Sequence, residues 1–325
     1  MESGELNGSN TKRSFLTGSQ QPGARAFAEA VTDASSSSRD GFQLFTTREI
    51  WKMKMPRLKQ TKLGTYRVGR LGVRELLRGV SRSWRAFRRQ SDLPPDIQQA
   101  KDFLRVYGLC GPYTMTSLER VYALWEAVRY VVRADVPGSI VECGVWKGGS
   151  CMLCAATLME LESPSRDIVL YDTFEATTAP GAMDVQYDGT AAQDLWKVNG
   201  GNWCEAGLEE VRANMDRTGY PKDHLVFVKG KVEETLQSNV PGCISLLRLD
   251  TDWFQSTSVE LKTLFPLLSE GGVLIIDDYG HWRGQKQAVD SYFQEAEWPI
   301  LFNRVDYTCR IGVKLASAPR EGKSR

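Results

Sequence analysis

Residues 139–150 read SIVECGVWKGGS, a short apolar run followed by a glycine-rich turn and the start of a helix-forming run. Glycine lets the backbone of such a turn approach a ligand closely, and the N–H groups of the following helix point toward it. The spacing G-x-x-x-G-G differs from the G-x-G-x-x-G of dinucleotide-binding turns. This stretch therefore predicts a strand–turn–helix unit, with Glu142 and Gly144 where the strand ends. The turn either binds a ligand or is a tight turn without one.

The same alternation of strand and helix continues toward the C-terminus. We expect further strands at 168–171, 225–228, 244–249 and 273–276. Amphipathic runs of helical length lie between them, which predicts an α/β fold with a doubly wound, mostly parallel sheet. Two late runs, near 299–303 and 306–314, are joined too tightly for a crossover, so we expect a closing antiparallel hairpin. A capping-box sequence at Thr116 predicts the start of a helix that runs through Val132.

The N-terminal part of the chain differs from the rest in charge. The whole chain has 41 Lys+Arg against 40 Asp+Glu, yet residues 1–90 carry a formal charge of +11 and residues 91–325 carry −10. Serine- and glycine-rich sequence predicts disorder near the N-terminus. Residues 73–89 repeat apolar side chains at helical spacing between arginines, which predicts a basic amphipathic helix. The Leu-Pro-Pro at 93–95 ends it.

These features predict four segments. They are a basic, disordered extension over 1–71, the amphipathic helix and a linker over 72–95, the α/β domain over 96–318, and a tail over 319–325. Three roles are open for the amphipathic helix: packing on the main domain or on a second subunit, binding an anionic membrane surface, or binding an acidic partner. A near-neutral total normally excludes a polyelectrolyte function for the whole chain, but here it hides the charge split. We expect no nucleic-acid partner for the chain as a whole, although nucleic acid is among the acidic partners that the helix leaves open.

Composition and cysteine usage indicate a globular protein of the cytoplasm. Hydrophobic residues make up 42% of the chain and charged residues 25%, as in ordinary globular domains. Apolar runs such as VLII at 273–276 are far shorter than the roughly 20 residues of a transmembrane helix. The N-terminus MESGELNGSN shows no secretory signal. An odd count of seven cysteines indicates reduced thiols rather than a disulfide framework.

The ends of the predicted strands supply the candidate site residues, because a doubly wound sheet binds its ligand beyond the carboxyl ends of its strands. Glu142, Asp172 and Asp250 each end a strand, and Asp277 and Asp278 end another. A carboxylate just before the glycine turn would repel a pyrophosphate and attract a cationic group. This favours a zwitterionic cofactor such as S-adenosylmethionine over NAD. We expect Asp172 to accept hydrogen bonds from ribose hydroxyls.

Four carboxylates lie at two of these strand ends, in LDTD at 249–252 and in IDD at 276–278. Neighbouring strand ends are about 5 Å apart, so these charges repel each other unless a cation neutralises them. Mg²⁺, a hard cation with oxygen ligands, is the natural candidate. The alternative is that the aspartates cap the following helices. His281, on the next loop, is a candidate general base or substrate contact, or else a packing partner of Trp282.

Six stretches carry a resemblance to a known family, and they occur in this order: TMTSLERVYALWEAVRYVV, PGSIVECGVWKGGS, RDIVLYDTFE, FVKGKVEETL, LLRLDTDWFQST and GGVLIIDDYGHWRG. Residues from about 113 to 316 resemble the macrocin-type (TylF-like) O-methyltransferases, which methylate sugar hydroxyls of macrolides and related natural products. The resemblance implies a class I methyltransferase fold, S-adenosylmethionine, Mg²⁺ and a homo-oligomer. One departure is the sequence after Glu175, where the family usually continues with Gly-Met and an acidic lid.

The resemblance also implies roles for individual residues. Asp250, Asp277 and Asp278 are implied as metal ligands, and Asp252 is implied either to position the sulfonium end of the cofactor or to act as base. The implied cofactor contacts are Glu142, Gly144, Ser150 and Asp172, together with Thr116 in a lid over the cofactor and Val232 near the adenine.

The implied activity is Mg²⁺-dependent transfer of a methyl group from S-adenosylmethionine to a sugar hydroxyl of a natural product or glycoside. Binding to Mg²⁺ lowers the pKa of such a hydroxyl, and Asp252 or His281 would then take its proton. Two alternatives remain open. One is a metal-dependent enzyme that methylates a catechol-like phenol, and the other is a non-catalytic binding protein that keeps the fold. The strand-end carboxylates, all retained, argue against the second.

Overall fold

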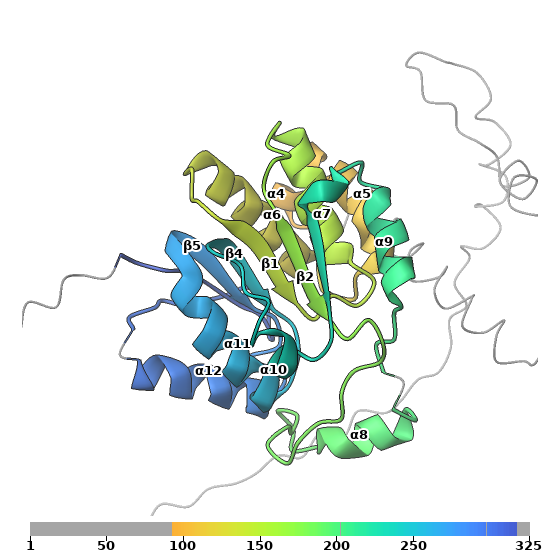
Figure 1. The fold of residues 1–325 in the computed structure, drawn as a ribbon, viewed down its shortest axis with the longest axis vertical. Coiled ribbons are helices and arrows are strands. Elements are labelled where there is room, and N and C mark those ends of the chain that lie inside the picture. The colour runs from red at the N-terminus through yellow and green to blue at the C-terminus, as the bar shows by residue number, and fades with distance from the viewer. Residues whose placement is uncertain (1–92, 202, 297, 317–325) are drawn as a thin grey trace, which may run out of the picture. The chain divides into compact units, whose positions relative to one another are not determined.

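The computed structural model of this chain describes residues 93–201, 203–296 and 298–316, which are coloured in Figure 1. The predicted disordered extension over 1–71, the amphipathic helix expected at 73–89 and the tail over 319–325 all lie outside the described residues. The predicted α/β domain is thus the part that the structure describes. None of its helices in these ranges combines the length and the apolarity needed to cross a bilayer.

Seven strands of the described residues form one sheet. They are β1 (Ser139–Cys143), β2 (Ile168–Asp172), β3 (Leu225–Lys229), β4 (Ile244–Leu249), β5 (Leu268–Ile276), β6 (Asn303–Arg304) and β7 (Arg310–Val313). Their order across the sheet is β3-β2-β1-β4-β5-β7-β6. Strands β1 to β5 pair in parallel, whereas β7 runs antiparallel to both β5 and β6. The predicted sheet with its closing antiparallel pair is confirmed.

Helices cover both faces of this sheet (Figure 1). One face carries α4 (Pro95–Gln99), α5 (Lys101–Cys110), α6 (Leu118–Arg133), α7 (Gly149–Glu160) and α9 (Leu208–Asp216). The other face carries α10 (Val232–Thr235), α11 (Phe254–Leu264) and α12 (Arg283–Glu295). Short 3₁₀ turns lie at Gly111–Tyr113, Lys222–His224 and Phe265–Leu267. Helix α8 (Ala192–Val198) lies away from the sheet, in the long connection between β2 and α9.

Successive residues of the central strands pack on opposite faces. In β4, Leu246 belongs to the apolar cluster under α5, α6 and α7, and Leu247 belongs to the cluster under α10, α11 and α12. Because both faces are covered, the central strands are mostly apolar rather than alternating. Arg248 is the charged residue of β4, and its side chain is only 4% exposed. A charge buried in this way requires opposite charges nearby.

Helix α6 begins one residue later than the sequence predicts. The capping box was expected to start at Thr116, but the N-cap is Ser117, whose hydroxyl accepts a hydrogen bond from the N–H of Arg120 at 3.2 Å. A hydroxyl residue at either position can satisfy a free helix N–H, so the local pattern does not distinguish them. The Ser117 hydroxyl also donates to Asp306 at 2.8 Å, which ties the start of the helix to the last loop.

The turn after β1 requires glycine at position 144 for steric reasons. Gly144 has a φ of +83°, and a Cβ there would lie 2.1 Å from the carbonyl oxygen of Asp250. Two backbone bonds fix this approach, since Gly144 N–H donates to Tyr171 at 2.9 Å and Asp250 N–H donates to Cys143 at 2.8 Å. The end of β1 is therefore pressed between the ends of β2 and β4.

Replacing Gly144 with Ala should lower the free energy of unfolding by roughly 2–5 kcal/mol, because left-handed strain and a backbone clash add together. Urea denaturation of the full chain measures it. Gly219→Ala is the matched control, since Gly219 has a φ of +70° but no heavy atom within 4 Å of the added Cβ. That control should lose only about 1 kcal/mol. Equal losses in the two variants would contradict the steric account.

Candidate active site

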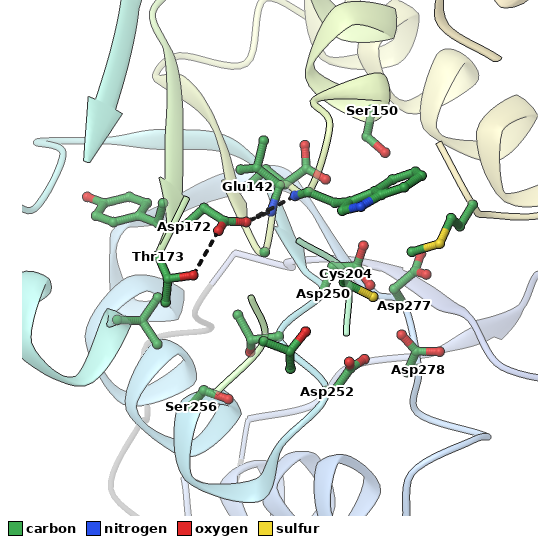
Figure 2. A pocket seen from close by; sticks show the side chains of 18 of the residues that line it. Glu142, Ser150, Asp172, Thr173, Cys204, Asp250, Asp252, Ser256, Asp277 and Asp278 are labelled. Carbon is green, nitrogen blue, oxygen red and sulfur yellow. Dashed lines mark hydrogen bonds between the residues drawn. The ribbon is translucent and has the colours of Figure 1, made fainter. Parts of the chain in front are cut away.

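A cavity of about 290 Å³ opens at the carboxyl ends of β1, β2, β4 and β5 (Figure 2). Every residue that the sequence singled out as a candidate lines it: Thr116, Glu142, Gly144, Ser150, Asp172, Val232, Asp250, Asp252, Asp277, Asp278 and His281. The segments 113–116 and 203–204 also contribute to its wall. The parallel topology thus brings together residues that are far apart in the sequence, as expected for this class of sheet.

The carboxylate of Asp172 organises the glycine turn from the end of β2. One of its oxygens accepts the N–H groups of Val145 at 2.6 Å and Trp146 at 3.0 Å. The other accepts the N–H of Phe174 at 2.7 Å and the hydroxyl of Thr173 at 3.3 Å (Figure 2). A carboxylate accepts about four hydrogen bonds, so a ribose hydroxyl at Asp172 would have to replace one of these donors. The long bond from Thr173 is the weakest of them.

Arg248 is the centre of a buried ion-pair network. Its guanidinium donates to Glu142, and it donates at 2.7 Å to both Asp250 and Asp277. Burial opposes the charged form of Arg248, but Asp250, Asp277 and Glu142 hold its pKa well above the usual value. The second oxygen of Glu142 accepts the thiol of Cys151 at 2.7 Å. Glu142 therefore lines the cavity with both of its oxygens already bonded to the protein.

Asp277 is held by two arginines. One of its oxygens accepts from Arg248, and the other accepts from Arg120 of α6. The Arg120 guanidinium also lies 3.1 Å from Asp306. Its side chain is only 2% exposed and each of its oxygens already accepts from a guanidinium, so a metal ion at Asp277 would have to share those oxygens with the arginines. This distinguishes Asp277 from Asp278, although the resemblance implies both as metal ligands.

A neighbouring trio offers the ligand atoms that a metal ion requires. One carboxylate oxygen from each of Asp250, Asp252 and Asp278 lies within 4.8 Å of the others. Burial raises the pKa of Asp250 and of Asp278 well above the usual value, and neighbouring carboxylates raise both further. Burial and Asp250 raise the pKa of Asp252 to about 7. Such crowding of like charges is relieved by a hard divalent cation.

Asp252 adopts a backbone conformation that is unusual for a residue other than glycine. Its φ is +68°, in the left-handed region. Trp146, with a φ of +47°, and Cys204, with a φ of +56°, also line the cavity. Non-glycine residues in this region are under strain and cluster at functional sites. The carboxylate of this strained residue lies beside that of Asp278.

His281 is already engaged at both ring nitrogens. Its Nε2 lies 3.2 Å from the side-chain amide of Gln186, and its Nδ1 lies 3.3 Å from the hydroxyl of Tyr307. The ring also packs edge-on against Trp282, with 4.8 Å between centroids. Burial lowers the pKa of His281, and Arg120 lowers it further. His281 therefore packs against Trp282, as the packing interpretation predicts, and it also lines the cavity.

Three tryptophans attach the long connection after β2 to the site. Trp203, Trp253 and Trp282 pack with ring centroids 5.1–6.3 Å apart. The indole N–H of Trp253 donates to the carbonyl of Thr178 at 3.0 Å. Trp253 and Trp282 directly follow Asp252 and His281 in the chain, so this packing fixes the loops that carry those side chains.

Two residues of the network were not predicted, Arg248 and Arg120. Arg248 did carry a signal in the sequence, because a single charge within an apolar strand must find opposite charges when it is buried. Arg120 carried none, since an arginine on an amphipathic helix is normally solvent-exposed. Only the tertiary structure brings its guanidinium to Asp277.

Glu260 holds the loop that connects Asp250 to Asp252. It is fully buried on α11, and one of its oxygens accepts the hydroxyl of Thr251 at 2.8 Å. The other oxygen finds no hydrogen-bond partner among the described residues. Burial raises the pKa of Glu260 to about 8. Glu260 therefore holds Thr251, the residue that connects Asp250 to Asp252.

Comparison with known proteins gives consistent matches to one family. A family model for Macrocin-O-methyltransferase (TylF) matches residues 96–311. The chain is 37% identical over 168 residues to the 8-demethyl-8-(2,3-dimethoxy-alpha-L-rhamnosyl)-tetracenomycin-C 4'-O-methyltransferase of Streptomyces olivaceus, covering 51% of this chain and 62% of that relative. It is 33% identical over 181 residues to the demethyldecarbamoylnovobiocin O-methyltransferase of Streptomyces niveus, covering 55% of this chain and 67% of that relative.

A solved structure agrees with the family match. The structure of the O-methyltransferase NovP superposes with a TM-score of 0.57 at 27% sequence identity, covering 63% of this chain and 83% of that chain. The match to the Streptomyces olivaceus relative spans less than two thirds of that protein's length. The match to the family thus lies within the α/β domain.

Replacing Glu260 with Gln should change the pH dependence of stability. Between about pH 4.5 and pH 8, the folded protein keeps a proton on Glu260 that the unfolded chain has lost, so stability falls as pH rises. Gln cannot ionise, and the variant should gain stability over the wild type by on the order of 1 kcal/mol per pH unit in this window. Urea denaturation at several pH values measures this. Glu234→Gln, at an exposed site on α10, is the control. A difference that does not vary with pH would contradict the assignment.

Proposed function

Because the chain belongs to the Macrocin-O-methyltransferase (TylF) family, we propose that it transfers a methyl group from S-adenosylmethionine to a sugar hydroxyl of a natural product. One observation carries the proposal. A single cavity holds both a glycine turn at the end of β1 and a group of carboxylates at the ends of β4 and β5. The glycine turn suits binding of the cofactor, and the carboxylates suit binding of an acceptor hydroxyl.

The sugar acceptor is supported by a relative. The Streptomyces olivaceus protein is named for 4'-O-methylation of a compound that carries a rhamnosyl group. A sugar hydroxyl is a weak nucleophile at neutral pH, so its methylation needs a group that accepts its proton. The acidic side of the cavity offers such groups. We therefore propose a glycoside rather than a phenol as the acceptor.

We propose that the cofactor lies on the side of β1 and β2. The turn at Gly144 and the hydroxyl of Ser150 at the start of α7 would receive its amino acid end. Asp172 would receive the ribose, and Thr116 would cover it from the segment before α6. Val232, which packs into the apolar cluster under α10, offers an apolar surface for the adenine.

On the acidic side, we propose Asp250 and Asp278 as the ligands of a Mg²⁺ ion. Mg²⁺ in enzymes is usually held by one or two carboxylates and keeps several waters, and each of these two carboxylates offers one oxygen to the trio. When bound, the ion supplies a lower pKa for a coordinated acceptor hydroxyl. Asp277 is left out of this set because Arg120 and Arg248 hold both of its oxygens.

Asp252 is the proposed general base. The reaction forms a bond between the acceptor oxygen and the methyl carbon while the carbon–sulfur bond breaks, which leaves S-adenosylhomocysteine. The proton of the acceptor hydroxyl passes to the Asp252 carboxylate. Asp252 lines the cavity beside Asp278, whereas both ring nitrogens of His281 already have partners. His281 is accordingly proposed as a contact for the acceptor.

The test is methyl transfer from S-adenosylmethionine to a panel of glycosides and catechols, with Mg²⁺ or with EDTA. We expect methylated glycosides with Mg²⁺ and a strong loss of product with EDTA. Methylation of the catechols alone would favour a phenol methyltransferase. Cofactor binding without product on any acceptor would favour a non-catalytic binding protein.

Two variants separate the candidate bases in the same assay. Asp252→Asn should lower kcat by roughly 10²–10⁴-fold, because it removes the proton acceptor. His281→Gln should lower kcat less and raise the KM for the glycoside. Calorimetric titration with S-adenosylmethionine serves as the control, and both variants should bind it like the wild type. A larger kcat loss in His281→Gln than in Asp252→Asn would transfer the base to His281.

A further inference from the structure

Two exposed tyrosines flank His281, which lines the cavity, although the tyrosines themselves are not among its lining residues. Tyr187 is 60% exposed and Tyr307 is 53% exposed. Their ring centroids lie 6.3 Å apart and the rings meet at 74°. The His281 ring lies 5.9 Å from Tyr187 and 6.0 Å from Tyr307. We call Tyr187, His281 and Tyr307 the aromatic rim.

The backbone under each tyrosine is fixed, although the rings are exposed. Tyr187 N–H donates to the carbonyl of His281 at 2.9 Å, and the Arg283 guanidinium donates to the carbonyl of Tyr187 at 2.7 Å. The neighbouring residue Gln186 forms a β-bridge with Trp282. The connection after β2 is therefore joined here to the loop that follows β5.

The backbone around Tyr307 is fixed by Asp306 and by the loop that contains Gly280. The carboxylate of Asp306 accepts the N–H groups of Thr308 at 2.9 Å and Cys309 at 2.8 Å, which closes a tight turn around Tyr307. Gly280 N–H donates to the carbonyl of Thr308 at 2.8 Å. A Cβ on Gly280 would lie 1.9 Å from the carbonyl oxygen of Tyr307, so the two loops are in direct contact. Exposed rings on a fixed backbone lose little conformational freedom when they bind a ligand.

The aromatic rim borders the carboxylates rather than the glycine turn. His281 lines the cavity, and its backbone N–H donates to the carbonyl of Asp278 at 2.9 Å. Burial raises the pKa of Tyr307, and the nearby charge of Asp278 raises it further. A molecule that rests on the rim therefore lies next to the acidic trio and away from Ser150 and Asp172.

The chemistry of the rim fits one face of a sugar ring. The face of an aromatic ring is electron-rich and its edge is electron-poor, so it attracts the C–H groups on the apolar face of a pyranose. Two rings at a steep angle form a corner that can hold a ring on two sides. The hydroxyl groups of that sugar would remain free to reach Asp252 and Asp278.

We infer that the aromatic rim is the acceptor-binding platform, on which Tyr187 and Tyr307 stack against the sugar ring that carries the hydroxyl to be methylated. This inference rests on the proposed function, because a sugar acceptor is part of that proposal. It adds two residues that contact the acceptor and not the cofactor. They lie on two loops that are more than a hundred residues apart in the sequence.

The test uses methyl α-L-rhamnopyranoside as the probe, with the full chain loaded with S-adenosylhomocysteine and Mg²⁺. Saturation-transfer NMR titration gives its dissociation constant. Tyr187→Ala and Tyr307→Ala should each raise that constant by about tenfold, the usual range for losing an aromatic contact. Tyr187→Phe keeps the ring and should bind within about threefold of the wild type. The affinity for S-adenosylhomocysteine should be unchanged in all of them.

Tyr130→Ala is the matched control, because this tyrosine on α6 is 40% exposed but its hydroxyl lies beside Gly271, near the start of β5 and not at the carboxyl end where the cavity opens. It should leave rhamnoside binding unchanged. Wild-type binding by both Ala variants, equal losses in Tyr187→Phe and Tyr187→Ala, or no binding of the probe to the wild type would each overturn the inference. Failure of the proposed function has a different signature, in which the rhamnoside binds through the rim but is never methylated.

Discussion

The guanidinium of Arg248 lies where water does not reach, and it holds the carboxylates of Glu142, Asp250 and Asp277 around it. These acids come from the ends of β1, β4 and β5, which are neighbours in the sheet. Without a cation between them they would repel each other, and burial would favour their neutral forms. Arg248 thus allows three adjacent strands to end in carboxylates at one edge of the sheet, and the rest of the site is built on that edge.

This network divides the acidic residues into two groups. All of them line the cavity, but Asp277 and Glu142 accept hydrogen bonds from Arg248, whereas Asp252 and Asp278 belong to the trio that could hold a metal ion. Asp250 belongs to both groups, since one oxygen accepts from Arg248 and its side chain is 24% exposed. Because Asp250 interacts with Arg248 and also lines the cavity, a change of charge in the cavity also affects the ion pairs at the strand ends. A cation near Asp278 would interact with a set of charges that Arg248 already balances in part.

The sequence predicted the sheet and the acidic strand-end residues of the cavity because both follow from local patterns, whereas Thr116, Ser150 and Val232 followed from the family resemblance. Buried parallel strands are continuous apolar runs, and the residues that end them must meet at one edge. It did not predict how neighbouring carboxylates divide their partners, because only tertiary contacts place an arginine on each oxygen of Asp277. Helix α8 was also missed, since its connection is held by tryptophans distant in sequence. The metal, the base and the acceptor platform stay proposals.

The most direct test of the central role of Arg248 compares Arg248→Lys with Arg248→Met. Lysine keeps the charge but not the planar fork that reaches several carboxylates, and methionine leaves the acids unpaired. Urea denaturation should show the order wild type, Lys, Met in falling stability, with a loss of about 3–5 kcal/mol for Met. Calorimetry on the folded Lys variant should show S-adenosylmethionine binding weakened by about tenfold, or 1.4 kcal/mol. Wild-type stability and cofactor affinity in both variants would contradict the account.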